Sequence, residues 1–273
     1  MRNTLIGKDI LNINEMTPDQ FRYLIDLSAT LKSQKKAGID QHWFGGKNVL
    51  SNFEWGSTRT RCAFETSCND LGMGFTYLSN SHVNDTETIE DSIRVFSAMY
   101  DLIVWRAQKE ESYIRQIADI SDVPVINALS LGDHPTQMLA DALTMEEQWG
   151  GAGSCKGKKM AFVGNCAGAP FWYGRLAAIL GMDFYAIGPD VLAKQMCKAM
   201  RDDVQDCFDR WAPNRKFVCT SDLDALEGID VVVTEEWRYD NPEVGNQVCD
   251  PEQYESFMRY AKGCLLYTSD AAD

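Results

Sequence analysis

Hydroxyl and guanidinium side chains are concentrated at residues 57–61, where the sequence reads Ser-Thr-Arg-Thr-Arg. The apolar run before them predicts a strand over residues 47–53, and the apolar spacing after them predicts a helix over residues 57–71. The run therefore lies at a helix N-terminus, where unpaired amide N–H groups and the positive end of the helix dipole attract anions. Hydroxyls can donate to phosphate oxygens, and guanidinium groups match phosphate in two-point contacts. The composition predicts a phosphate-binding turn formed by Ser57, Thr58, Arg59 and Thr60.

A simpler interpretation of this turn stays open. Ser57 could be an ordinary N-cap, with Arg59 and Arg61 in solvent in the first helical turn. Cations at a helix N-terminus oppose the dipole by roughly a few tenths of a kcal/mol each, so a bound anion would explain two of them there.

A second group of polar residues surrounds His134. This residue precedes Pro135, which fits the first turn of a helix predicted over Pro135–Trp149, so its ring would stand beside another helix N-terminus with Gln137 one turn further on. A loop histidine is often structural or solvated, so the residue alone does not establish catalysis. Arg106 follows a strand predicted over residues 102–105, and it could equally be an edge residue that extends into solvent.

The elements that must position these residues alternate along the chain. A first helix begins at Pro18 with Thr17 as its N-cap. Strands are predicted at residues 47–53, 75–78, 102–105 and 123–127, and helices at residues 57–71, 88–99, 112–120 and 135–149. Such alternation predicts a parallel sheet, and ligands bind outside the carboxyl ends of its strands. Arg59, Arg106 and His134 should therefore face one crevice.

A Gly- and Ser-rich stretch at residues 150–154 predicts a domain boundary. The alternation then resumes, with strands predicted at residues 158–163, 184–187, 216–219 and 231–234 and helices at residues 171–180 and 191–208. The expected fold class is α/β, with two domains that each contain a parallel sheet flanked by helices. The expected limits are 1–149 for the first domain and 155–263 for the second.

Composition excludes several classes of protein. The net charge of −14 over 273 residues argues against nucleic acid and anionic membranes as partners. No apolar run approaches the roughly 20 residues of a membrane span, and the first residues lack a signal-peptide core, so we expect a cytoplasmic protein. The nine cysteines form no CxxC pair and the three histidines are far apart, so neither a metal site nor a disulfide framework is predicted.

Three motifs resemble those of the aspartate/ornithine carbamoyltransferase family, and their flanks are most similar to its ornithine branch. They are residues 57–61 followed by Cys-Ala-Phe-Glu, Trp105-Arg106, and His-Pro-Thr-Gln at 134–137 followed by Leu-Ala-Asp. The similarity is close from residue 5 to about residue 149 and looser to about residue 263. It implies a two-domain fold, a role in amino-acid and arginine metabolism, and transfer of the carbamoyl group of carbamoyl phosphate to an amine without metal or organic cofactor.

The resemblance also implies residue roles and an assembly. Ser57, Thr58, Arg59 and Thr60 would hold the phosphate, Arg106 and His134 would donate to the carbamoyl oxygen, and Gln137 would accept from the carbamoyl amino group. The family forms homotrimers or multiples of them, with a loop after the second strand shared between subunits. In that loop His82 stands where the ornithine enzymes typically carry glutamine, and it could reach phosphate or simply be exposed.

The second half departs further from the family pattern. Residues 163–170 stand in the place of a family segment but lack the asparagines that bind the amino-acid end of ornithine, and they contain no GxGxxG fingerprint for a dinucleotide. Trp237 matches a family position, whereas Glu235 stands for an aspartate and the expected Ser-Met-Gly clamp is missing. The implied amine-binding residues are Asn165, Glu235 and Trp237, although the two glutamates at 235 and 236 could also form a solvated strand end.

The expected activity is transfer of the carbamoyl group to an amine, with ornithine as the acceptor. Two alternatives stay open: a carbamoyltransferase for another amine, such as putrescine or a modified amino acid, and a catalytically silent paralogue that binds phosphorylated metabolites. Residues 264–273 resemble translated adapter or vector sequence, and the family's His-Cys-Leu-Pro motif and closing helix would lie beyond them, so we expect a non-native tail and a truncated second domain.

Overall fold

The structure is a computed structural model that describes residues 5–79, 81–83, 85–164, 169–188, 198–234, 238–241, 245–248 and 266–268. The chain divides into two compact units, Met1–Leu143 and Thr144–Ala271. The division falls inside the helix Pro135–Trp149, which the sequence placed wholly in the first domain. The predicted domain limits remain predictions. Each unit is described by itself below.

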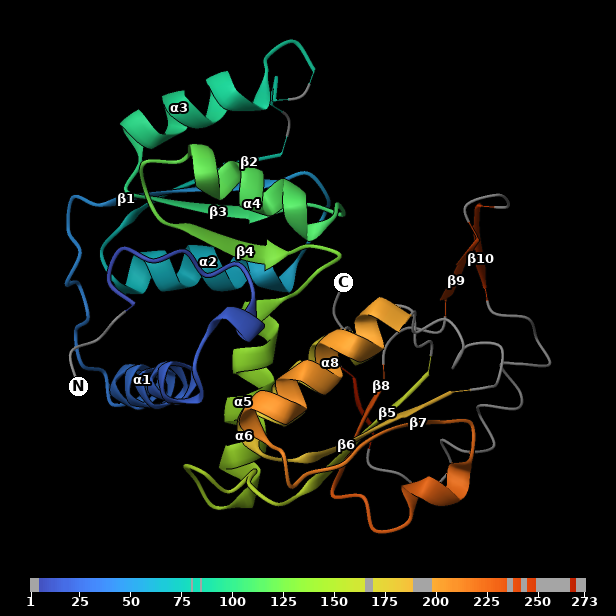
Figure 1. Ribbon diagram of the computed structural model, residues 1–273. Coiled ribbons are helices and arrows are strands. Elements are labelled where there is room, and N and C mark those ends of the chain that lie inside the picture. Colours follow the sequence, from blue (N-terminus) through green and yellow to red (C-terminus); the bar gives the residue numbers. More distant parts are fainter. Residues whose placement is uncertain are drawn as a thin grey trace. The chain divides into compact units, whose positions relative to one another are not determined.

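The first unit contains a four-stranded parallel sheet in the order β2-β1-β3-β4 (Figure 1). Its strands are β1 (Asn48–Phe53), β2 (Gly74–Leu78), β3 (Leu102–Arg106) and β4 (Val125–Leu129). Its helices are η1 (Ile13–Glu15), α1 (Pro18–Lys36), α2 (Arg59–Asp70), α3 (Ile89–Met99), α4 (Glu111–Ile120) and the first part of α5 (Pro135–Trp149). The predicted alternation and parallel sheet are confirmed.

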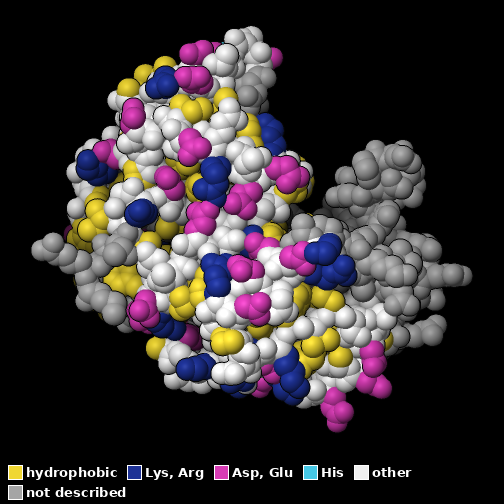
Figure 2. Space-filling model, in the orientation of Figure 1, with side chains coloured by type: hydrophobic (Ala, Val, Ile, Leu, Met, Phe, Trp, Pro, Cys, Tyr) yellow, Lys and Arg dark blue, Asp and Glu magenta, His cyan; other side chains and the backbone are white. Residues whose placement is uncertain are grey.

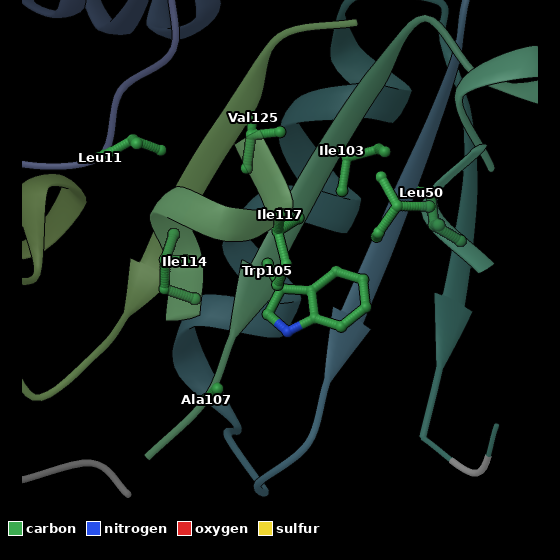
Figure 3. Packing of buried hydrophobic residues seen from close by; sticks show 9 residues of the cluster. Leu11, Leu50, Ile103, Trp105, Ala107, Ile114, Ile117 and Val125 are labelled. Atoms are coloured by element: carbon green, nitrogen blue, oxygen red, sulfur yellow. The ribbon is translucent and has the colours of Figure 1, made fainter. Parts of the chain in front are cut away.

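Two apolar layers cover the faces of this sheet. On one face, Leu50, Ile103 and Trp105 pack with residues of α3 and α4, as Figure 3 shows for Ile114 and Ile117 of α4. On the other face, strand residues pack against α2; the buried members of that cluster are Val49, Phe53, Cys68, Val104 and Ala128. Side chains alternate along a strand, so successive residues of one strand point into opposite layers. Burial on both faces explains why these strands read as continuous apolar runs.

The helix starts follow capping chemistry, with one departure from expectation. Thr17 caps α1 in a capping box with Gln20, and Pro18 occupies the first turn as predicted. The second helix was expected to begin at Ser57, but it begins at Arg59 with Thr58 as its N-cap. Thr58 has helical backbone angles and its side chain makes no capping hydrogen bond. The interpretation of Ser57 as an ordinary N-cap is therefore wrong.

The second unit contains a five-stranded parallel sheet in the order β11-β8-β5-β6-β7 (Figure 1). Its strands are β5 (Lys159–Val163), β6 (Asp183–Ile187), β7 (Phe217–Thr220), β8 (Val231–Thr234) and β11 (Leu266–Thr268). Its further elements are α6 (Ala169–Leu180), α8 (Lys198–Trp211), η2 (Leu223–Leu226) and an antiparallel pair, β9 (Arg238–Asn241) with β10 (Gly245–Val248). This antiparallel pair was not predicted, and β11 lies within the segment expected to be a non-native tail.

The surface and the composition of the described residues add three observations. Asp and Glu side chains are scattered over the face seen in Figure 2, interspersed with Lys and Arg, in keeping with the net charge of −14. Within the described ranges, no helix combines the length and apolar character that a bilayer span requires. The same residues contain no cluster of His, Cys, Asp and Glu that could hold a metal ion.

Candidate active site

The start of α2 offers hydrogen-bond donors that the described chain does not use. The Thr58 side chain makes no capping hydrogen bond, and the first amide N–H groups of a helix have no partner within the helix itself. The side chain of Arg59 is partly buried, and its Nη1 atom is enclosed without a hydrogen-bond partner among the described residues. An enclosed charged donor without an acceptor is costly, so an anion at this turn would stabilise it.

The two arginines of the turn have different surroundings. The guanidinium carbon of Arg61 lies 4.0 Å from the centre of the Tyr77 ring at the end of β2. Its Nε is also 4.0 Å from the Glu65 carboxylate one turn along α2. In this structure Arg61 therefore fastens α2 to β2, and Arg59 is the arginine with an enclosed nitrogen that lacks an acceptor.

Arg106 ends β3 in the middle of the sheet. Its register partners are Phe53, which ends β1, and Leu129, which ends β4. The pairing with β4 slips at this point, because Trp105 pairs with Asn127 and the next pair is Arg106 with Leu129. The bulge leaves Ala128 as an extra residue, and such bulges change the direction of neighbouring side chains. Arg106 is only 2% exposed, so a cationic group is buried at this edge of the sheet.

The loop before α5 is fixed by an interior hydrogen-bond network. The buried carboxylate of Asp133 accepts from the backbone N–H of Ile13 at 2.8 Å and from that of His134 at 2.7 Å. The side-chain amide of Asn127 donates to the Leu11 carbonyl at 2.9 Å and to the Asp133 carbonyl at 3.1 Å. The N-terminal segment thus holds the histidine loop against the end of β4.

The side chains of His134 and Gln137 are oriented by neighbours on α5. His134 is 6% exposed, and its Nδ1 lies 3.3 Å from the Thr136 hydroxyl. When this hydroxyl donates to Nδ1, the ring proton resides on Nε2, which is then a donor. The Gln137 amide nitrogen donates to the Asp141 carboxylate at 3.0 Å, which leaves the amide oxygen as an acceptor.

The sequence predicted that Arg59, Arg106 and His134 face one crevice, and this remains a prediction; the register places the three residues at the carboxyl ends of neighbouring strands. The strands β1, β3 and β4 are adjacent and parallel, and the three residues follow or end them. Two guanidinium groups, an imidazole and a helix N-terminus at one edge can bind an anion and stabilise an oxyanion. The roles given to Ser57, Thr58 and Thr60 remain predictions.

His82 makes its described contacts within its own loop. Its carbonyl accepts from the backbone N–H groups of Asp85, Thr86 and Glu87, and its Nδ1 lies 3.0 Å from the Thr86 hydroxyl. The side chain is exposed. Its predicted approach to phosphate remains a prediction.

The predicted amine-binding residues Asn165, Glu235 and Trp237 lie outside the described residues. The strands before them are neighbours, since β5 pairs with β8. The Thr234 hydroxyl donates to the Val163 carbonyl at 2.7 Å and fastens the ends of these two strands together.

Sequence reasoning gave no role to Asp133, Asn127 or Asp141. The spacing of Asp141 four residues after Gln137 could have indicated a helical side-chain pair. Asp133 and Asn127 act through contacts with Leu11 and Ile13, more than a hundred residues earlier, and no local pattern indicates such pairing.

Comparisons with known proteins give consistent matches. The family model described as "Aspartate/ornithine carbamoyltransferase, carbamoyl-P binding domain" matches residues 8–147. The catabolic ornithine carbamoyltransferase of Clostridium perfringens (strain 13 / Type A) is 39% identical over 240 residues, which cover 87% of this chain and 70% of the relative. That of Treponema denticola is 43% identical over 188 residues, covering 68% and 54%.

Two solved structures share the fold. The ornithine carbamoyltransferase from Pyrococcus furiosus has a TM-score of 0.79 at 27% identity, covering 85% of this chain and 73% of that one. The mitochondrial ornithine carbamoyltransferase from Coccidioides immitis has a TM-score of 0.82 at 25% identity, covering 96% and 85%.

Proposed function

Because the chain belongs to the aspartate/ornithine carbamoyltransferase family, we propose that it transfers the carbamoyl group of carbamoyl phosphate to ornithine, giving citrulline and phosphate. The observation that carries the proposal is the register that sets Arg106 between the ends of β1 and β4. The anion-binding turn follows one of these strands and the histidine loop follows the other. The anion-binding turn and the histidine loop therefore follow the strands on either side of the buried Arg106.

The turn at the start of α2 holds the phosphate group. Arg59 supplies a charged donor whose enclosed Nη1 has no acceptor in the described chain, and the N-terminus of α2 supplies backbone N–H groups. Ser57, Thr58 and Thr60 add hydroxyl donors. A phosphate here gives the enclosed Arg59 nitrogen the acceptor that it lacks among the described residues.

Arg106 and His134 stabilise the charge that develops on the carbamoyl oxygen. The amine nitrogen attacks the carbonyl carbon, the C–N bond forms, and the oxygen gains negative charge in a tetrahedral intermediate. Donors fixed in a buried site stabilise such an oxyanion more strongly than water does. The burial of Arg106 supports this role, and so does the Thr136 hydroxyl near the His134 Nδ1, because a hydroxyl that donates to Nδ1 leaves the ring proton on Nε2.

The remaining steps need orientation more than added chemistry. The Gln137 oxygen accepts from the carbamoyl amino group, which holds the plane of the substrate for attack. The C–O bond to phosphate then breaks, its electron pair leaves with phosphate, and the nitrogen loses a proton to phosphate or water. Attack requires a neutral amine, so the rate should rise with pH until the amine is deprotonated.

The proposal also covers the residues that bind the amine substrate and the assembly of subunits. Asn165, Glu235 and Trp237 bind the amine substrate, and His82 contacts phosphate in a neighbouring subunit of a homotrimer. The similarity to enzymes named for ornithine supports this acceptor.

A panel of amines tests the proposal. The protein is mixed with carbamoyl phosphate and, in separate reactions, ornithine, putrescine, lysine or aspartate, and the carbamoylated amine is measured by mass spectrometry. Citrulline formation at the highest kcat/KM is expected. A higher kcat/KM with putrescine would replace ornithine as acceptor, and absence of every product under conditions where phosphate binds would establish a non-catalytic binding protein.

A further inference from the structure

Glu54, the first residue after β1, collects contacts from the end of β3 and the start of α4. One carboxylate oxygen accepts from the Trp105 indole N–H at 2.9 Å and from the Tyr113 hydroxyl at 2.6 Å. The other lies 2.8 Å from the Lys109 ammonium, which also stands 3.9 Å from the centre of the Tyr113 ring. The Glu54 side chain is 24% exposed, so these contacts are partly shielded from water.

The backbone of Glu54 continues this connection. Its N–H donates to the carbonyl of Arg106 at 2.9 Å, next to the register pair of Phe53 with Arg106. Figure 3 shows the Trp105 indole among apolar side chains, with its nitrogen turned toward the strand ends. Glu54 therefore binds Trp105 through its carboxylate and Arg106 through its backbone N–H.

We propose that Glu54 is a positioning residue for Arg106. The inference rests on the proposed function, in which the Arg106 guanidinium stabilises the carbamoyl oxygen. Trp105 is fully buried, and without the carboxylate its N–H would lose an acceptor inside the protein. The segment from Trp105 to Lys109 would then shift to find other partners. A displacement of about 1 Å at a catalytic group can lower the rate about a hundredfold.

The phosphate-binding turn depends less on this carboxylate. It is held by α2 itself, whose first turn begins with the Cys62 N–H bonded to the Thr58 carbonyl and is fastened to β2 through Arg61. Loss of the Glu54 carboxylate should therefore affect turnover and spare phosphate binding. A purely structural residue would not separate these two properties.

Asp101 provides a matched control because it joins the same two strands at their opposite ends. Its carboxylate accepts from the Lys47 ammonium at 2.7 Å and from the Asn48 backbone N–H at 2.9 Å. Asp101→Ala removes a similar set of contacts at the amino ends of the strands. It should lower the melting temperature without changing the site.

The experiment compares kcat with saturating substrates and the dissociation constant for inorganic phosphate, in the full chain. For Glu54→Ala we expect kcat to fall about thirtyfold while phosphate affinity stays within about threefold of wild type. Glu54→Gln keeps an acceptor oxygen and should recover kcat to within about fivefold of wild type, and Asp101→Ala should stay within about twofold. Tyr113→Phe, which removes one donor, should lower kcat about threefold and serves if Glu54→Ala does not fold.

Three results would overturn the inference. The first is a wild-type kcat in a folded Glu54→Ala or Tyr113→Phe variant, and the second is a loss of phosphate affinity as large as the loss of kcat. The third is a loss of kcat in Asp101→Ala as large as that in Glu54→Ala. Failure of the proposed function looks different. In that case the wild-type protein itself forms no carbamoylated amine, whereas in each of the three results above the wild-type protein is active.

Discussion

The amide nitrogen of Gln137 donates to the carboxylate of Asp141, 3.0 Å away and one helical turn further along α5. An amide can turn over and exchange its donor and acceptor ends, and this contact selects one orientation. The fixed orientation leaves the Gln137 oxygen as the acceptor, which is the end that the proposed contact with a carbamoyl amino group requires.

Replacing Asp141 should therefore impair turnover through Gln137. In Asp141→Asn the new side chain can donate as well as accept, so both orientations of the Gln137 amide become available. We expect kcat/KM for carbamoyl phosphate to fall about tenfold, which corresponds to one hydrogen bond. Steady-state kinetics measure this change, with thermal unfolding as the check on folding. An unchanged kcat/KM would show that the Gln137 amide is oriented by other groups.

Arg59 and Arg61 should differ in their effect on phosphate binding. Arg59→Ala removes a charged donor that has no acceptor within the described chain, so phosphate affinity should weaken by about 2 kcal/mol, or about thirtyfold. Arg61→Ala removes the contact with Tyr77, so it should lower the free energy of unfolding by about 0.5–1 kcal/mol and affect phosphate much less. Titration calorimetry with inorganic phosphate separates the two; equal losses of affinity would contradict the assignment.

Asp133 should be important for stability as well as for the site. Its carboxylate accepts from the backbone N–H groups of Ile13 and His134 in the interior, and each buried donor left without an acceptor costs about 1–3 kcal/mol. Asp133→Ala should lower the free energy of unfolding by about 2–4 kcal/mol, measured by urea denaturation. Asp133→Asn retains one acceptor oxygen and should lose less. If both variants unfold like wild type, the network does not hold the loop.

Cysteine reactivity provides a test of the second unit. Burial, with a contribution from the Asp203 carboxylate, raises the pKa of the Cys207 thiol to about 11. At pH 8 only about one molecule in a thousand carries the reactive thiolate there, and the fraction grows as pH rises toward the pKa. Iodoacetamide should therefore modify the exposed Cys62 and spare Cys207 in the native protein. Peptide mass spectrometry after urea unfolding should find both modified; equal native rates would contradict the packing of α8.

Local patterns were sufficient to predict many elements of the fold. The ranges Pro135–Trp149 and Val231–Thr234 agree with the structure residue for residue, because a proline start and a short apolar run define them. The start of α2 was displaced by two residues, since the hydroxyls of Ser57, Thr58 and Thr60 all offered possible caps. The hairpin of β9 and β10 was missed.

The roles of the candidate site residues stay predictions, whereas the contacts that support these residues could not be predicted from the sequence. Arg59, Arg106 and His134 carry motifs, and the parallel order of the strands brings them to one edge. The stacking of Arg61 on Tyr77 and the bulge at Ala128 depend on tertiary packing. No spacing in the sequence indicates such contacts.

The bond between Ile13 and Asp133 spans 120 residues of sequence, which bears on the order of folding during synthesis. A ribosome releases the first of these residues long before it makes the second, and closing so large a loop is slow. The helix α1 can form early. The loop that carries His134 can take its final structure only after β4 has been made and the segment around Ile13 has packed against it. The candidate active site is therefore expected to form late in the folding of the first unit.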